Sequence, residues 1–445
     1  MNHPQESTHP DIGSTKISPA ACHQDSIEPP SCSPRLMGNE LRGQAPAHQH
    51  PVWVPERMAE VSSSGAYGHF TVTNDISRYT HAEPFSRPGQ QTPVFARFSH
   101  QPRTHRSDSL PDIHGFAVRF HTGEGDWDLV GQNTPVFFIH DPDRFPALLH
   151  ALGAAARTDR TAAWDFWSRT PESLNLLTML LSDDGQPIGA RFMDGHGGHT
   201  YSLWNARRER FWVRFHFRAE QSPRALIREG AQGGIAPAPE AFHADLHQAI
   251  ACGDFPSWTL YIQVMPESRD GQYPHDPFDP TRIWSEAEHP LIEVGVMRLD
   301  RNLDDRFSRL EPISLSPANL IPGIGHSHDR ILQARIFSCT DTIPNRHGGP
   351  QPLMTDDEAD ITPSGHTPSS APDSPPIASI QQAGARFRLL APEHQQRLAA
   401  RMAGSMQDVP ATLIDRQLAL LAQADPRYAR LVREALASAH GATIK

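Results

Sequence analysis

Short apolar and aromatic runs, separated by polar turn residues, dominate the chain from Trp53 to about Met297. Each run is bounded by Gly, Pro, Asn or Asp, which favour turns and interrupt regular structure. Eight such runs each predict a β-strand, and they span residues 67–75, 94–99, 113–121, 127–138, 199–206, 210–217, 258–265 and 291–299. The middle of the sequence is therefore a strand-dominated region.

Several of these runs alternate in the two-residue period of a strand with two different faces. In the second run, Phe95, Arg97 and Ser99 fall on one face and the residues between them fall on the other. An open sheet of this size would expose two strand edges, whereas a closed barrel of eight strands has no edges and a packed interior. We therefore predict a barrel.

A spacing of three to four residues between apolar positions marks the helical parts of the chain. One helix-like stretch, at residues 143–156, lies between the fourth and fifth predicted strands. Three more follow near the C-terminus, where Asp425 and Pro426 form a good N-cap and first-turn pair for the last helix. Their apolar stripes are Leu398, Met402 and Met406; Leu413, Ile414, Leu418 and Leu421; and Tyr428, Leu431, Val432 and Leu436. Residues 381–445 are therefore predicted to form a C-terminal helical segment.

Two stretches lack the apolar residues that a core requires. Residues 1–50 are rich in Pro, Ser, His and Gln, so they cannot offset the entropy of ordering, and we predict disorder there. Residues 348–380 are rich in Pro and Ser, which is typical of a linker or an extended wrapping arm. The chain thus divides into this N-terminal segment, a barrel core at residues 51–347, the linker and the helical segment.

Composition narrows the class of protein further. The 445 residues carry a net charge of −11 and no cluster of Lys or Arg, which argues against binding to nucleic acid or to an anionic membrane. No apolar stretch reaches the roughly 20 residues of a membrane span, and the N-terminus does not resemble a signal peptide. The 4 cysteines are too few and too scattered for a disulfide framework. We expect a cytoplasmic protein whose partners are small molecules or other subunits.

The segment GDWDLVGQNTPVFFIHDPDRFP at residues 125–146 is similar to the haem catalases almost residue for residue. Four further segments resemble the same family in the same order: VPERMAEVSSSGAYGHFTVT (54–73), VFARFS (94–99), HTYSLWNA (199–206) and NLIPGIGHSHDRILQARIFSCTDT (319–342). The C-terminal SMQDVPATLIDRQLALLAQADPRYARLV is similar to the tail of the larger-subunit catalases. The resemblance covers roughly residues 51–347 and 381–440.

This resemblance implies an α+β fold, with an antiparallel eight-stranded β-barrel, surrounding helices and the C-terminal helical segment. It also implies a haem, with its iron, buried between the barrel wall and the helices, and hydrogen peroxide as the substrate. The family usually forms tetramers with threaded N-terminal arms, but the segment before Val54 is short for such an arm. We therefore expect a homo-oligomer without assigning its size.

Several residues match positions at which the family holds haem. Arg57 and Arg97 match arginines that pair with the haem propionates, a role suited to a bidentate cation. Ser99 matches a position beside the distal acid/base, on the side where peroxide binds, and Phe145 matches the aromatic residue that stacks on the porphyrin. The alternatives are a surface or structural role for the two arginines, a strand cap for Ser99 and a place in the core for Phe145.

Three more residues match on the proximal side, where the protein supplies the iron ligand. Arg335 matches the arginine that hydrogen-bonds to this ligand. His199 and Asp329 match the network that supports the arginine, although a histidine taken alone is more often only structural. The resemblance therefore predicts an intact proximal network.

The chain departs from the family at the three side chains that touch peroxide and iron. Glu60 stands in place of the histidine that takes and returns the peroxide proton, and a buried carboxylate with a raised pKa can do the same work. Glu60 could equally mark a distal site that no longer does chemistry. Gln132 stands in place of the asparagine that orients peroxide, and its amide lies one methylene further along. Cys339 stands in place of the tyrosine that ligates iron.

Cys339 is the most informative of the three. A thiolate is a strong haem ligand that favours O–O cleavage, and the nearby Arg335 would help to keep Cys339 ionised. Against this, a cysteine sulfur reaches roughly 3 to 4 Å less far from its Cα than a tyrosine oxygen does, so ligation needs the backbone to approach haem or a water to bridge the gap. The alternative is a buried, inert cysteine in a protein with altered or no haem.

A thiolate ligand with a distal glutamate is also found in fungal haem-thiolate peroxygenases and chloroperoxidases, which have an unrelated fold. By this analogy, our first hypothesis is an enzyme that uses hydrogen peroxide or an organic hydroperoxide for peroxidase- or peroxygenase-like oxidation of a small organic substrate, with weak disproportionation. The second is an authentic catalase in which Glu60 and Gln132 suffice. The third is a haem-binding or haem-free pseudoenzyme without catalysis.

Overall fold

This computed structural model describes residues 62–100, 113–152, 160–185, 187–221, 239–269, 273, 275–303, 315–336 and 375–442. Arg57, Glu60 and Cys339 lie outside these ranges, and so do residues 1–50 and most of the linker at 348–380. The roles that the sequence predicts for them stay predictions.

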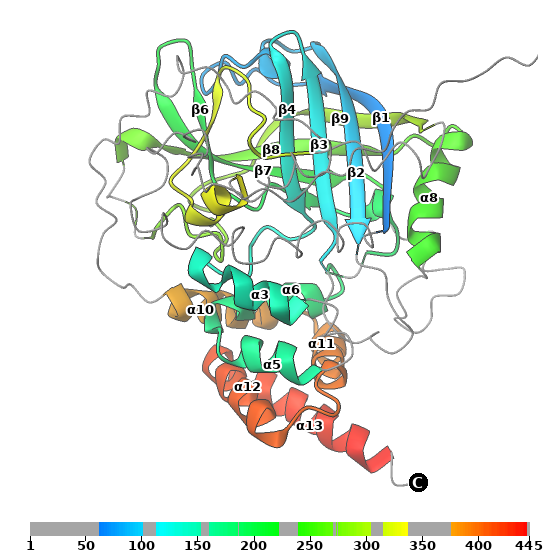
Figure 1. Ribbon diagram of the computed structural model, residues 1–445, viewed down its shortest axis with the longest axis vertical. Coiled ribbons are helices and arrows are strands. Elements are labelled where there is room, and N and C mark those ends of the chain that lie inside the picture. The colour runs from blue at the N-terminus through cyan, green and yellow to red at the C-terminus, as the bar shows by residue number, and fades with distance from the viewer. Residues whose placement is uncertain are drawn as a thin grey trace, which may run out of the picture. The chain divides into compact units, whose positions relative to one another are not determined.

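Ten strands form one sheet in the described part of the chain. Eight of them are β1 (Ser62–Val72), β2 (Gln91–His100), β3 (Gly115–Thr122), β4 (Gly125–Gln132), β5 (Gly195–His196), β7 (Arg210–Ala219), β8 (Ser257–Pro266) and β9 (Ile292–Asn302). These eight follow one another in the order β7, β5, β4, β3, β2, β1, β9, β8, and β8 pairs with β7 to close the ring. The remaining two, β6 (Tyr201–Trp204) and β10 (Ile324–His326), extend the sheet beside β7. The predicted eight-stranded antiparallel barrel is confirmed (Figure 1).

The strand predicted at residues 199–206 is observed as the shorter β6, which lies outside the ring of eight, and the prediction missed β5, which takes its place in the ring. Both β5 and β6 pair with the same edge of β7, β5 at Phe217 and β6 at Val213. Between them, Gly198 has a φ of 71°. This left-handed conformation is easy only for glycine and breaks the pairing. Only the two residues of β5 therefore join β7 to β4.

Two other predicted elements are shorter than expected. The strand predicted at residues 127–138 ends at Gln132, because Pro135 has no backbone N–H to donate to a ladder. The helix predicted at residues 143–156 is observed as α3 (Phe145–Leu152), preceded by a short 3-10 turn, and its predicted end lies outside the described residues.

One face of the strands fills the interior of the barrel. Phe98 and Phe116 are buried there, with ring centroids 5.2 Å apart. Burial of such a side chain contributes about 1.5 to 3 kcal/mol relative to leaving it exposed. Because successive side chains of a strand point to opposite sides, Arg97 and Ser99 lie on the outer face.

Helices pack against one another outside the barrel. α5 (Arg160–Ser168) and α6 (Leu174–Leu181) follow α3, and α8 (Pro239–Ala251) packs against β1 and β9. The C-terminal helices are α10 (Pro375–Leu389), α11 (Pro392–Ser405), α12 (Ala411–Ala424) and α13 (Pro426–Ala442). All of these except α8 contribute side chains to one apolar core. No helix within the described ranges is both long and apolar enough to cross a membrane.

The C-terminal segment has one helix more than the three predicted. α10 begins at Pro375, inside the stretch that we assigned to the linker, and its Ile380, Ala383 and Phe387 join the apolar core at helical spacing. The predicted cap of the last helix is confirmed, because Asp425 Oδ1 accepts the N–H of Arg427 at 2.8 Å.

Candidate functional site

The strand register aligns two predicted site residues on the outer face of the barrel. Ser99 on β2 pairs with Gly115 on β3, and Gly115 pairs with Gln132 on β4. Paired residues of antiparallel strands point to the same side, so the side chains of Ser99 and Gln132 flank the bare backbone of Gly115. A Cβ at Gly115 would lie 2.3 Å from Ser99 Oγ, so any side chain there would require the Ser99 hydroxyl to move. Arg97 lies two residues before Ser99 on this face and is partly buried.

The Gln132 side chain is buried and braces its own turn. Its Nε2 donates to Thr134 Oγ1 at 2.9 Å and to the carbonyl of Val136 at 2.6 Å. These two bonds use both amide hydrogens. The amide that we predicted to orient peroxide thus holds the backbone that leads into Phe137.

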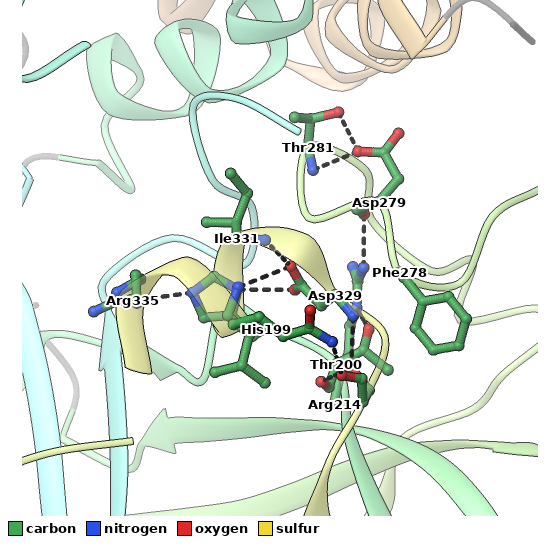
Figure 2. A network of polar contacts seen from close by, with 12 residues as sticks. His199, Thr200, Arg214, Phe278, Asp279, Thr281, Asp329, Ile331 and Arg335 are labelled. Carbon is green, nitrogen blue, oxygen red and sulfur yellow. Dashed lines mark hydrogen bonds and ion pairs between the residues drawn. The ribbon is translucent and has the colours of Figure 1, made fainter. Parts of the chain in front are cut away.

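His199 lies at the centre of a buried polar chain, which Figure 2 shows. Its Nδ1 is 2.8 Å from Asp329 Oδ2, and its Nε2 is 2.8 Å from Arg335 Nη1. The side chains of His199 and Asp329 are 1% and 0% exposed. Asp329 Oδ1 also accepts two N–H groups, at 2.9 and 3.0 Å, from the first turn of the helical residues 330–336. One carboxylate therefore caps the helix that carries Arg335 and orients the imidazole.

The polar chain sets the protonation state of His199. Burial lowers the pKa of His199, although the Asp329 carboxylate acts in the opposite direction. The imidazole is therefore neutral at pH 7. Because a carboxylate can only accept, the proton sits on Nδ1, and Nε2 accepts from the Arg335 guanidinium. An imidazolium could not make this second hydrogen bond.

Phe137 connects this polar chain with Phe145. The Arg335 guanidinium carbon is 5.9 Å from the Phe137 ring centroid, and His199 lies 5.7 Å from it, ring centroid to ring centroid. The rings of Phe137 and Phe145 are nearly parallel, at 12° and 6.4 Å between centroids. Sequence reasoning named Phe145 but missed Phe137. Its signal was its place inside the matching segment 125–146, directly after the Gln132 turn.

Arg214 on β7 was also missed. It is 3% exposed, and its Nη2 donates to the carbonyl of Asp279 at 2.8 Å. The signal was present in the alternation of RFWVRFHF, which places Arg214 and His216 on the face opposite the interior residues Phe215 and Phe217. Alternation alone suggests solvent for that face, but the loop around Asp279 covers it.

The structure therefore brings Arg335, His199, Asp329 and Phe145 together around Phe137. It aligns Ser99 and Gln132 through the strand register, with Arg97 beside them. Within the described ranges, no group of three or more His, Cys, Asp or Glu side chains could hold a metal ion directly.

These residues fit a planar cofactor that carries anionic groups. Phe137 and Phe145 offer parallel aromatic surfaces, Gly115 leaves a side-chain-free stretch of wall, and Arg97 supplies a cation. A closed antiparallel barrel with such a site on its outer face defines a class of barrel proteins that hold a planar prosthetic group between wall and helices.

The chain belongs to the catalase family. Residues 16–353 match the family described as Catalase, and residues 379–436 match the family described as Catalase-related immune-responsive. Catalase family proteins bind haem iron and act on hydrogen peroxide, and the fit above agrees with haem at this site. The chain is thus an oxidoreductase of the haem-dependent, peroxide-using type.

Known relatives cover nearly the whole chain. A catalase of Streptomyces coelicolor is 36% identical over 94% of this chain and 96% of its own length. A catalase of Helicobacter pylori is 40% identical over 86% of each chain. Among solved structures, catalase A of Saccharomyces cerevisiae shares 28% identity over 88% of this chain and 91% of its own, with a TM-score of 0.72. A bacterial catalase shares 29% identity over 93% and 94%, with a TM-score of 0.71.

Proposed function

We propose that this catalase-family protein uses hydrogen peroxide or an organic hydroperoxide mainly to oxidise a small organic substrate, and disproportionates peroxide only weakly. In this proposal Cys339 supplies the iron ligand and Glu60 the distal acid/base, by their places in the family segments. The observation that carries the proposal is the engaged amide of Gln132, whose two hydrogens are taken by Thr134 and Val136.

The proximal network supports a thiolate ligand. Cys339 follows Arg335 by four residues in the sequence, and Arg335 is held by the neutral His199. A guanidinium held in this way can donate a hydrogen bond to a thiolate and stabilise its charge. Arg335 would therefore keep Cys339 ionised and lower its affinity for a proton.

The distal residues define a different proton path from that of the family. Haem, when bound, supplies the redox chemistry with peroxide; Arg57 and Arg97 would hold its propionates, and Phe137 and Phe145 would face its ring. Glu60 would take the proton from one peroxide oxygen and return it to the other, which leaves as water from hydrogen peroxide or as an alcohol from an organic hydroperoxide. Disproportionation needs a second peroxide to be oriented as a reductant, and the Gln132 amide has no hydrogen left to orient it.

One spectrum tests the ligand assignment. The haem-loaded protein, reduced under carbon monoxide, should show a strongly red-shifted Soret band, which Cys339→Ala abolishes. The exposed Cys252 provides the matched control, so Cys252→Ala should keep the band. An unshifted band in the unmodified protein would remove Cys339 as the ligand, and failure to take up haem would remove both enzyme hypotheses.

An oxygen electrode separates the remaining two activities. We expect slow oxygen release from hydrogen peroxide, and faster peroxide consumption when an oxidisable phenol is added. Vigorous oxygen release that Glu60→Ala abolishes would instead identify an authentic catalase. The test also needs Glu60→Gln, which keeps the size of the side chain and removes its acid/base function.

A further inference from the structure

Arg214 is a buried cation whose hydrogen bonds go to neutral oxygens. Its guanidinium donates to Thr200 Oγ1 at 3.2 Å and to the carbonyl oxygens of Pro277, Asp279 and Arg282. No carboxylate in the described part of the chain lies within ion-pair distance of it. The guanidinium thus has fixed hydrogen-bond partners, but its charge must be balanced from further away.

Asp329 is the first of the groups that balance this charge. Burial lowers the pKa of Arg214 to about 10, and the carboxylates of Asp329, Asp279 and Asp276 act against this, whereas the Arg282 guanidinium adds to it. Arg214 is therefore a cation at pH 7. Figure 2 shows Arg335, His199, Asp329 and Arg214 one after another across the view. The Asp329 carboxylate thus lies between two cations. Arg335 lies beyond the His199 imidazole, and Arg214 lies on the opposite side.

Hydrogen bonds through Thr200 and Ser327 also link Arg214 to the backbone of Asp329. Thr200, which follows His199, accepts from Arg214 through its Oγ1. The carbonyl of Thr200 accepts a hydrogen bond from Ser327 Oγ. Ser327 Oγ in turn accepts the backbone N–H of Asp329 at 3.1 Å. Thr200 Oγ1 also donates to the carbonyl of Pro277 at 2.7 Å. Displacement of Arg214 would therefore disturb the backbone on both sides of the His199–Asp329 pair.

We propose that Arg214 is a positioning residue for Arg335. As an internal cation it stabilises the ionised Asp329, which fixes His199 in the neutral Nδ1–H form whose Nε2 accepts from Arg335. The coupling of Arg214 to His199 stands on the described contacts alone. Its consequence for the iron ligand rests on the proposed function.

A purely structural role is the competing explanation, because Arg214 also holds the loop that carries Asp279. Two variants separate the roles. Arg214→Met removes the charge and all donors, and Arg214→Lys keeps the charge but loses the guanidinium fork. The matched control is Arg218→Met on the same strand, because Arg218 is 45% exposed and pairs with Asp194 and Glu286 at the surface.

The experiment follows His199 by NMR in the full chain, labelled with ¹⁵N-histidine and studied as the diamagnetic, haem-loaded, carbon monoxide complex. In the unmodified protein, in Arg214→Lys and in Arg218→Met, His199 should stay in the Nδ1–H form down to acid unfolding. In Arg214→Met the His199 pKa should rise by about one unit, because a nearby cation no longer opposes protonation. The Arg335 hydrogen bond should be lost as His199 takes up the proton.

Other outcomes would overturn the proposal. If Arg214→Met leaves the His199 titration unchanged and only accelerates amide exchange in residues 275–283, Arg214 is structural. If Arg214→Met does not fold, Arg214→Lys decides: a His199 pKa that rises by about one unit although the charge is kept would show that the charge is not what matters. These readings do not depend on Cys339, so they remain valid if the carbon monoxide spectrum shows no thiolate.

Discussion

Gln132 differs from the family's asparagine by one methylene, and this extra length decides what the amide contacts. It lets Nε2 reach the carbonyl of Val136 as well as Thr134 Oγ1. The shorter Asn would leave at least one amide hydrogen free on the outer face of the barrel. The conservative appearance of the change is therefore misleading, since the chemistry of an amide depends on where its hydrogens point.

We expect Gln132→Asn to raise the rate of oxygen release from hydrogen peroxide and to lower the free energy of unfolding by about 1 kcal/mol, the usual contribution of one buried hydrogen bond. An oxygen electrode and urea unfolding measure the two effects. Thr134→Val removes one of the two acceptors and leaves the bond to Val136, so it also frees one amide hydrogen and should raise oxygen release in the same direction. Equal oxygen release from Gln132→Asn and the unmodified protein would contradict the role given to the amide.

The Asp329 carboxylate offers a second test at the residue scale. Asp329→Asn keeps an oxygen to cap the helix at 330–336 but replaces the acceptor beside His199 Nδ1 with a neutral amide. We expect a loss of about 2 kcal/mol in the free energy of unfolding, because hydrogen bonds to charged groups contribute roughly 1.5 to 3 kcal/mol. Urea unfolding measures it. Asp279→Asn, which alters a buried carboxylate that caps Thr281 and not His199, should leave the His199 tautomer unchanged.

Among the strands, β5 is the weakest link of the ring, because its two residues alone join β4 to β7. There His196 and His216 meet with their Nδ1 atoms 2.8 Å apart. His216 Nε2 lies 3.1 Å from Gln263 Oε1, and Gln263 Nε2 donates to two carbonyls, so Oε1 is the acceptor. The His216 proton therefore sits on Nε2, and His196 donates to its bare Nδ1.

We expect acid to weaken the pairing of β5 with β7, where His196 and His216 meet. Burial lowers the pKa of His216 to about 3 and, together with the neighbouring His216, Arg218 and Arg386, lowers the pKa of His196 well below its ordinary value of 6.5. The unfolded chain therefore binds more protons than the folded one once the pH falls below about 6.5. Stability is fully present above that pH and decreases as the pH falls toward 3, by about 1.4 kcal/mol per pH unit for each extra proton.

The measurement is urea unfolding at pH 7 and pH 5. The double variant His196→Gln, His216→Gln should lose less stability between pH 7 and pH 5 than the unmodified protein. Neither glutamine at the contact between β5 and β7 takes up a proton in this range. His69→Gln, at a residue whose side chain is 52% exposed, serves as the control and should follow the unmodified protein. A pH dependence shared by all three proteins would show that the pair does not set acid stability.

On the scale of the whole molecule, the C-terminal helices share one apolar core with α3, α5 and α6. Leu176 and Leu180 of α6 share one apolar cluster with Leu398 and Met402 of α11 and with Tyr428 of α13. All five are 0% exposed. The linker between the barrel core and the helical segment therefore joins parts of one hydrophobic core.

We therefore expect that a chain that ends at residue 374 does not fold into a stable protein, because the apolar side chains of α6 are left uncovered. Truncation exposes α6, and each large apolar side chain left uncovered costs about 1.5 to 3 kcal/mol. Solubility on expression and binding of an apolar dye to the purified product measure this outcome. A chain that ends at residue 442 controls for truncation itself. A soluble, cooperatively unfolding barrel without residues 375–442 would contradict the shared core.

Local patterns anticipated much of this fold. The two-residue alternation in β2 and β7 separates interior from outer residues, because side-chain direction in a strand follows from the backbone alone. The cap at Asp425 is equally local. The strand β5 escaped prediction, because two residues are too few to show an alternation and Gly198, in a left-handed conformation, separates them from β6.

The site shows the same division between local pattern and tertiary contact. The sequence by itself determined which chemical groups are present: Glu60, Gln132 and Cys339 in place of the family's reagents, with Arg335 and His199 kept. For the residues that the structure describes, only the tertiary structure decided what their side chains can do. The Gln132 hydrogens are consumed by a turn, the His199 proton is placed by Asp329, and Arg214 becomes a buried cation under a distant loop. The physical reason is that hydrogen-bond geometry and desolvation depend on neighbours far apart in the chain, which no local pattern encodes.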